Sequence, residues 1–211
     1  MSCTPGRPEK RNCSAKRSCT LYMVNVCVYH PRTMKPLFTI HEGEFLVGDY
    51  ISRNFARKYD VWVPTKDSGV DLLVTRKGHN GKPVGLQVKF SRSFDIHKDF
   101  SRDVLATSWY TLDPKKIRRS EAQLWVFVFM TLRHERYFVL IPTPELRRRI
   151  PRGCRSKWNL YLWAYARGAC YQVRDLNLAG RLNAVRRGVQ DPYQDFSMYF
   201  EAWRLLDKMS R

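Results

Sequence analysis

Two short segments carry polar side chains of the kinds that can bind a cation or exchange a proton. Residues 69–74 and 84–91 are rich in aliphatic residues and are separated by Gly, Asn, Lys and Pro turn chemistry, which predicts two strands. Side chains alternate between the two faces of a strand, so Gln87 and Lys89 share one face of the second segment. Together with Asp71 on the first segment, a carboxylate, an amide and an ammonium group can meet over one face of a sheet.

A further candidate, Glu44, lies in the first turn of a helix predicted over residues 42–55. One face of that helix carries Glu44 with Val47, Gly48, Ile51 and Phe55. Because its other members are apolar or glycine, this face should pack on the sheet. A carboxylate at the end of a buried face costs free energy unless a cation meets it, and a metal ion or a lysine would serve.

Each of these side chains could also have an ordinary structural role. Asp71 could cap a turn or pair with Lys89, and Gln87 could lie on a solvated strand face. Glu44 could close a surface salt bridge. The order of the residues and the faces predicted for them favour one shared site over a separate role for each.

In this order and placement the residues resemble the PD-(D/E)xK nuclease superfamily, also called the restriction-endonuclease-like class. The matching residues are Glu44 on a first helix, Asp71 on a strand, and Gln87-Val88-Lys89 on the next strand. The similarity spans residues 42–142 and is to the variant with Gln at the second acidic position. Val70 stands where the name-giving proline would be.

The resemblance implies an α/β fold with a mixed central sheet flanked by helices, extended here by a helical C-terminal segment. It implies a hydrolase: an endonuclease that cleaves DNA phosphodiester bonds and depends on Mg²⁺ or Mn²⁺. The implied metal ligands are Asp71, the Gln87 amide oxygen, the Val88 backbone carbonyl, and Glu44 either directly or through water. Lys89 would orient or deprotonate the attacking water. The alternative is a catalytically inactive nuclease-like fold that binds nucleic acid or a protein partner.

The charge of the chain indicates a polyanionic partner. The 211 residues carry a formal charge of +19, and residues 34–211 hold 32 of the 38 basic and 18 of the 19 acidic residues. The excess runs through segments that read as folded, which favours nucleic acid, including branched or single-stranded DNA. The predicted phosphate contacts are Ser91, Arg147, Arg148, Arg149, Arg152, Arg155, Lys157, Arg186 and Arg187.

Domain organisation follows from where the pattern begins. Residues 1–33 show no periodic spacing of hydrophobic residues, which predicts a basic, disordered tail. Either translation starts at Met34 and these residues are not part of the working protein, or they form an arm that contacts phosphates. Residues 34–211 predict a single domain, with a core at 42–142 and a basic extension at 143–211. No apolar run predicts a membrane span, and a homodimer is one assembly open to this class. The six cysteines show no Cys-x-x-Cys pair, which favours reduced thiols and a cytoplasmic location.

The remaining elements are predicted from local signals. Strands are expected at residues 59–64, 124–130, 137–141, 158–165 and 169–173. A helical crossover is expected within 94–120, with Asp113 as N-cap and Pro114 at the first helical position. Further helices are expected at 144–149 after Thr143, at 178–187 after Asn177, and from Pro192 onward after Asp191. The apolar stripe of the last helix, which includes Phe196 and Trp203, is expected in the core or at an interface.

Overall fold

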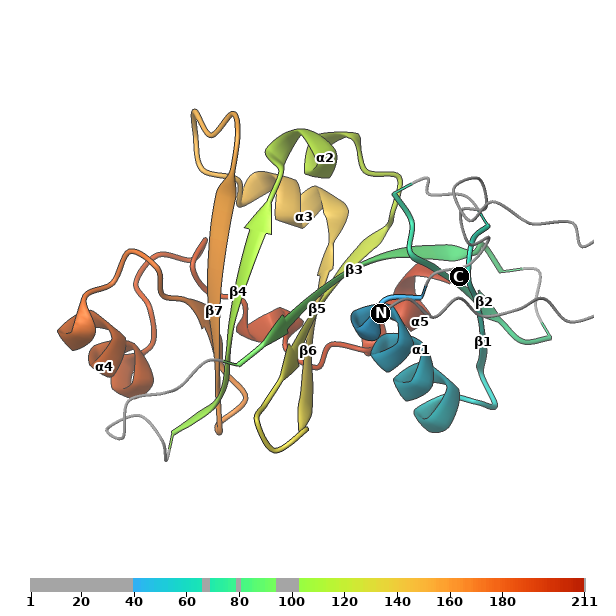
Figure 1. Ribbon diagram of the computed structural model, residues 1–211, viewed down its shortest axis with the longest axis horizontal. Helices are drawn as coiled ribbons and strands as arrows, with labels where there is room; N and C mark the ends of the chain where they lie inside the picture. Colours follow the sequence, from blue (N-terminus) through green and yellow to red (C-terminus); the bar gives the residue numbers. More distant parts are fainter. Residues whose placement is uncertain (1–39, 66–68, 79–80, 94–102, 211) are drawn as a thin grey trace, which may run out of the picture. The chain divides into compact units, whose positions relative to one another are not determined.

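Five strands form a mixed sheet in the order β1-β2-β3-β5-β6 (Figure 1). Its strands are β1 Tyr59–Trp62, β2 Leu72–Arg76, β3 Val84–Arg92, β5 Leu124–Met130 and β6 Arg136–Pro142. Only β3 and β5 run parallel, and the other neighbours in this sheet are antiparallel. The computed structural model describes residues 40–65, 69–78, 81–93 and 103–210, so the predicted tail at 1–33 lies outside the described residues.

Strand β5 lies at the centre of the protein because almost every side chain on it is apolar. Six of its seven residues are buried, as the uninterrupted apolar run at 124–130 predicted. In the parallel register Gln87 lies opposite Trp125 and Lys89 lies opposite Phe127. Strand β3 therefore places polar side chains next to the apolar side chains of strand β5.

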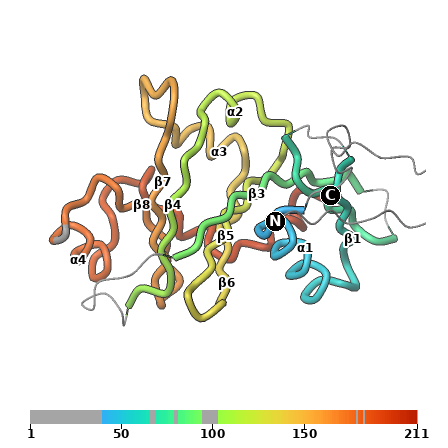
Figure 2. The backbone as a smooth tube through the Cα atoms, viewed as in Figure 1, coloured from blue at the N-terminus to red at the C-terminus, as the bar shows by residue number. Residues whose placement is uncertain are grey.

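A second, antiparallel sheet holds β4 Val104–Leu112, β7 Trp158–Tyr165 and β8 Cys170–Gln172. Figure 2 shows β7 and β8 side by side, with α4 next to them. The pairing of 158–165 with 169–173 was predicted, whereas β4 was not. The expected helix of the connection between β3 and β5 is present as a six-residue helix, Pro114–Arg119, but the connection also contains this nine-residue strand. Small polar residues in the middle of β4, Thr107 and Ser108, hide its alternation, although both are buried.

The helices are α1 Glu42–Asn54, α2 Pro114–Arg119, α3 Thr143–Arg148, α4 Leu178–Arg187 and α5 Arg204–Met209, with a 3₁₀ turn at Ser197–Tyr199. Two N-caps are confirmed, because Asp113 accepts the Lys115 N–H at 2.8 Å and Asn177 accepts the Gly180 N–H at 2.8 Å. Thr143 does not cap α3, since its hydroxyl donates to the Ala122 carbonyl. None of the described helices is long and apolar enough to span a bilayer.

The helix expected from Pro192 is wrong. Asp191 accepts the Tyr193 N–H at 2.8 Å, but it closes a turn instead of starting a helix. The residues of the expected stripe still reach the core, as predicted, since Phe196 and Leu206 are fully buried and Trp203 is 7% exposed. Since β7 and β8 also belong to this part of the chain, the C-terminal extension is mixed instead of helical.

The two faces of the five-stranded sheet bury two separate cores. Leu86 and Val88 belong to the core that includes α1, together with Trp203 and Leu206 from the C-terminal segment. The opposite face, with Trp125 and other aromatic residues of β5, packs against β4 and β7. The structure is therefore a mixed α/β arrangement in which α1 covers one face of the larger sheet and the smaller sheet covers the other.

Helix α1 approaches β3 so closely that one position requires glycine. The buried face of α1 is Gly43, Leu46, Val47 and Ile51, so it is rotated by about one residue from the predicted face. A Cβ added at Gly43 would lie 2.7 Å from Cβ of Phe90 and 3.3 Å from Cγ1 of Val88. The next residue, Glu44, is half-buried.

Candidate functional site

A cleft of about 1050 Å³ opens between the first turn of α1, the middle of β3 and helix α2. Its lining contains all of the residues predicted as catalytic or metal-binding: Glu44, Asp71, Gln87, Val88 and Lys89. Other polar residues in the lining are His41, Thr111, Asp113, Lys115, Lys116, Arg119 and Ser120. The residues that sequence order brought together are thus neighbours in space, and a basic helix forms another wall.

Asp71 is held by the backbone on both sides. Gly69 adopts φ +77°, a left-handed conformation that glycine tolerates, and the chain then enters the sheet, where the Asp71 N–H donates to the Leu86 carbonyl at 2.8 Å. The carboxylate oxygen Oδ2 accepts the Val88 N–H at 2.6 Å. Asp71 therefore stands immediately ahead of β2, one residue outside the strand, with its side chain directed at β3.

Gln87 interacts directly with this carboxylate. Its amide nitrogen Nε2 donates to Asp71 Oδ2, the same oxygen that the Val88 N–H contacts. The amide thereby has its nitrogen directed at Asp71, while a Cβ added at Gly69 would lie 4.0 Å from its carbonyl oxygen Oε1. A second acid at this position would set two carboxylates against each other, whereas the amide links the strands and keeps an oxygen as a potential ligand.

Glu44 is fixed by its own helix. The His41 N–H donates to Glu44 Oε2 at 3.1 Å across the first turn of α1. Burial raises the pKa of the Glu44 carboxyl above its usual value, and the nearby Asp71 carboxylate adds to the rise. The His41 N–H and Lys89 lower the same pKa and only partly offset the increase. Two carboxylates placed this close to each other favour a cation between them.

Lys89 supplies a positive charge from β3 itself. Its side chain shares the strand face of Gln87, and its ammonium nitrogen lies 5.6 Å from the centre of the Trp125 ring. Lys89 also lowers the pKa of Glu44, which places its charge within electrostatic reach of that carboxylate. The ammonium group therefore lies near the Glu44 carboxylate, beside the Trp125 ring in the lining of the cleft.

Helix α2 contributes three cations that were not among the predicted site residues: Lys115, Lys116 and Arg119. All three are exposed, whereas Ile117 between them is fully buried and anchors the helix. The sequence did contain a signal, because a single apolar residue within a basic turn leaves the opposite side of a helix uniformly charged. The missing information was that this helix faces Asp71 and Glu44.

The donor atoms of the cleft fit a hard divalent cation. Within the part of the chain that the structure describes, no group of three or more His, Cys, Asp or Glu residues gathers as a metal site. Apart from Asp113, whose side chain caps α2, the cleft offers the carboxylates of Glu44 and Asp71 and the amide oxygen of Gln87. Mg²⁺ takes oxygen ligands, keeps several waters and is commonly held by one or two carboxylates with substrate oxygens, so this set is compatible with it. Among the described residues, the lining of the cleft holds one histidine, His41, and no cysteine, whereas a zinc site commonly uses several such ligands.

Several of the predicted phosphate contacts have structural partners instead. The Ser91 hydroxyl accepts the Trp109 N–H at 3.1 Å, which links β3 to β4 outside the cleft lining. Arg147 donates to the carbonyls of Ile117 at 3.2 Å and Ser120 at 3.0 Å, and so closes the C-terminal end of α2. Arg147 therefore positions the basic helix without lining the cleft itself.

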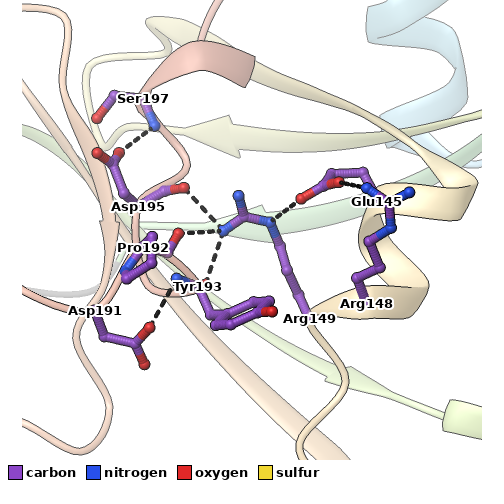
Figure 3. Close-up of polar contacts among 8 residues, drawn as sticks. All are labelled: Glu145, Arg148, Arg149, Asp191, Pro192, Tyr193, Asp195 and Ser197. Carbon is purple, nitrogen blue, oxygen red and sulfur yellow. Dashed lines mark hydrogen bonds and ion pairs between the residues drawn. The ribbon is translucent and has the colours of Figure 1, made fainter.

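Arg149 is buried in the core, where it cannot make the phosphate contact that was predicted for it. Figure 3 shows its guanidinium between Glu145 and the backbone of the C-terminal turn. The guanidinium donates to the carbonyls of Pro192, Tyr193 and Asp195 at 3.2, 2.8 and 2.8 Å, and it pairs with Glu145 at 3.3 Å. With a side chain only 6% exposed, Arg149 anchors the turn that the sequence predicted as a helix.

The other predicted contacts are exposed but do not line the cleft. Arg148 pairs with Glu145 at 3.3 Å on the surface of α3. Arg152, Arg155 and Lys157 lie in the loop between α3 and β7, and Arg186 and Arg187 lie at the end of α4. They remain predictions for a nucleic-acid surface, whereas the cations beside the acidic residues come from α2 and β3.

The class defined by these observations is a mixed α/β protein with an acidic pair, an amide and a lysine in one cleft beside a basic helix. No family model, curated protein or solved structure matches this chain. The functional argument therefore depends on the chemistry of the cleft.

Proposed function

We propose that this protein is a Mg²⁺-dependent endonuclease that hydrolyses phosphodiester bonds in DNA, with a restriction-endonuclease-like core. The observation that carries the proposal is the convergence of Glu44, Asp71, Gln87 and Lys89 in one cleft. The same residues, in the same order, carry the resemblance to the PD-(D/E)xK class. DNA as substrate and a cytoplasmic location are parts of this proposal.

The distribution of charge across the cleft supports a phosphodiester substrate. Lys115, Lys116 and Arg119 line it on the α2 side and attract a polyanion. Glu44 and Asp71 would repel the same polyanion unless a cation neutralised them. A cleft that combines both signs fits a phosphate that arrives together with a divalent metal ion.

Each side chain has a role that its contacts support. Asp71, Glu44, the Gln87 amide oxygen and the Val88 carbonyl would hold the metal ion, which when bound supplies Lewis acidity and charge neutralisation. Asp71 is pre-positioned by its bonds from Gln87 and the Val88 N–H. Lys89 orients the attacking water, donates to a non-bridging oxygen and offsets the negative charge that develops on the phosphate.

Cleavage of supercoiled plasmid with Mg²⁺ or Mn²⁺, compared with a chelator control, tests the proposal. Asp71→Asn keeps an oxygen to accept the Val88 N–H but removes the charge, and it should abolish cleavage, as should Lys89→Gln. The control variants are Asp60→Asn and Lys77→Gln, whose exposed side chains lie 3.2 Å apart, with Asp60 on β1 and Lys77 directly after β2. They should cut as wild type does, and full activity in the Asp71 or Lys89 variant would refute the site.

One observation favours an inactive nucleic-acid-binding protein as the second candidate. The amide nitrogen of Gln87 and the Val88 N–H both donate to Oδ2 of Asp71, so this carboxylate oxygen already has two donors in place of a metal ion. If these contacts persist, the cleft binds phosphate through α2 without cutting. Gln87→Glu separates the two: it should tighten metal binding in an active site, whereas identical metal titrations for both proteins would favour the binding role.

A further inference from the structure

An aromatic pair lies on the outer face of the second sheet. Trp109 on β4 is 50% exposed and stands directly opposite Tyr161 on β7, with ring centroids 5.0 Å apart and planes inclined by 49°. Farther along the same face, α4 covers Trp163 and forms a buried cluster there. The Trp109 end of the face is left open to solvent.

This open face continues into the cleft. Thr111 is on the same side of β4 as Trp109, two residues farther on, and it lines the cleft. Its hydroxyl donates to Asn159 Oδ1 at 3.0 Å, so the cross-strand pair next to the aromatic pair on this face is polar and hydrogen-bonded. Two residues of a strand span about 7 Å, which places the rings within one short step of the cleft.

Positive charge lies at both ends of the aromatic pair. Toward the cleft, Lys115 and Lys116 follow on α2. In the other direction, the Arg181 guanidinium lies 5.6 Å from the centre of the Trp163 ring. Trp163 follows Tyr161 by two residues on β7 and lies on the same face. Aromatic faces between cations suit a ligand that alternates phosphates with flat rings.

We propose that this face binds an unpaired DNA strand that leaves the cleft, with a base stacked on Trp109. Bases in a duplex are already stacked on each other, whereas bases of a single strand are open to aromatic side chains. The preferred substrate would then be DNA with a single-stranded segment next to the scissile phosphate. The proposal rests on the proposed nuclease function for what occupies the cleft, but stacking is measurable without cleavage.

The test is fluorescence anisotropy of the full-length protein in chelator, with a labelled single-stranded oligonucleotide and with its blunt duplex. Trp109→Ala should weaken single-strand binding about tenfold or more, because base stacking on an aromatic side chain contributes that much. Trp109→Phe should retain most of the affinity. Trp62→Ala is the control, because Trp62 is 58% exposed on β1 and does not line the cleft. Blunt-duplex affinity should change by less than about twofold in all three variants.

Tryptophan fluorescence is a second measurement, and it tests the proposal even if the Trp109→Ala variant does not fold. Stacking quenches tryptophan emission, so the quenching produced by single strands should fall in Trp109→Phe while binding persists. Undiminished quenching in Trp109→Phe, wild-type affinity in a folded Trp109→Ala protein, or equal loss in Trp62→Ala would each overturn the inference. So would wild-type protein that binds duplex as tightly as single strands. If Trp109→Ala loses single-strand binding but wild type cuts no DNA with metal, the stacking face stands and the nuclease proposal fails.

Discussion

Gly43→Ala is the substitution whose consequence follows most directly from the packing of the cleft. Gly43 sits in the first turn of α1, against β3, and its neighbour is Glu44. An added methyl would lie 2.7 Å from Cβ of Phe90 and 3.3 Å from Cγ1 of Val88. Both atoms belong to a strand inside the sheet, so the helix has to move away and carry Glu44 with it.

The size of the effect is set by two opposing contributions. Overpacking a close contact costs about 1–3 kcal/mol, while glycine to alanine within a helix contributes about 1 kcal/mol of stability. Gly48 offers the matched control in the same helix, because a methyl there would lie 3.9 Å from Cγ1 of Val61, an ordinary contact. Gly48→Ala should therefore be about 1 kcal/mol more stable than wild type. Gly43→Ala should be less stable than Gly48→Ala by about 1–3 kcal/mol.

Urea denaturation of the two variants measures this difference, and plasmid cleavage measures its effect on the site. A displacement of about 1 Å at Glu44 can lower a rate about a hundredfold, so Gly43→Ala should lose activity that Gly48→Ala keeps. Equal denaturation midpoints and equal cleavage rates would refute the close approach of α1 to β3. Lost activity with unchanged stability would show that Glu44 moves without strain in the packing.

Three further expectations follow from charged residues. The double variant Lys115→Ala/Lys116→Ala should reduce the salt dependence of duplex binding, by about 0.9 in the log–log slope for each phosphate that the variant no longer neutralises. Arg149→Met should destabilise the fold by about 3–5 kcal/mol in urea denaturation, because three backbone carbonyls and the partly buried Glu145 carboxylate lose their bonds to the buried guanidinium. Burial raises the pKa of Glu44, so the folded protein holds that proton more tightly than the unfolded chain and loses stability as pH rises through the raised pKa. Glu44→Gln removes that loss, and its stability advantage over wild type in metal-free buffer should grow as the pH rises above the usual pKa of a glutamate.

Each of these has a control of the same chemical type. Arg186→Ala/Arg187→Ala, on α4 outside the cleft lining, should leave the salt slope less affected than the α2 variant does. Arg148→Met, on an exposed side chain, should change stability by less than about 0.5 kcal/mol. Glu42→Gln, on an exposed residue of the same helix, should not stabilise the protein, because the change removes the ion pair of Glu42 with Arg92 at 3.1 Å. A reversed order within any of these pairs would contradict the corresponding assignment.

The elements that the sequence predicted correctly are those whose signals are local. Strand β5 was bounded correctly because its apolar run is buried on both faces, and a short run without polar interruption is typical of such a strand. Helix α4 begins where Asn177 caps it. The strands near Asp71 and Gln87 are only seven residues apart in the sequence, and their antiparallel pairing agrees with this local signal.

The misplaced elements depend on distant contacts. Asp191 and Pro192 form a helix-start pattern, but Arg149 binds the carbonyls that follow and holds them in a turn. One arginine in a run of three is buried, and nothing in the run distinguishes it from its exposed neighbours. Strand β4 was missed because its partner, β7, begins 46 residues after β4 ends.

The acidic side of the cleft was predictable and its basic side was not, and Ser91 shows why. Asp71 and Lys89 are placed by a hairpin, whereas α2 follows β4, which leaves the larger sheet. The Ser91 and Ser93 hydroxyls accept the Trp109 and Thr107 N–H groups at 3.1 and 3.2 Å, and these bonds hold β4 along the edge of β3. Ser91 was predicted to contact phosphate. Its observed contact with Trp109 instead helps to position β4, and β4 leads directly into α2 with its cations. The basic wall therefore depends on a side-chain link between two sheets, which periodicity in the sequence does not encode.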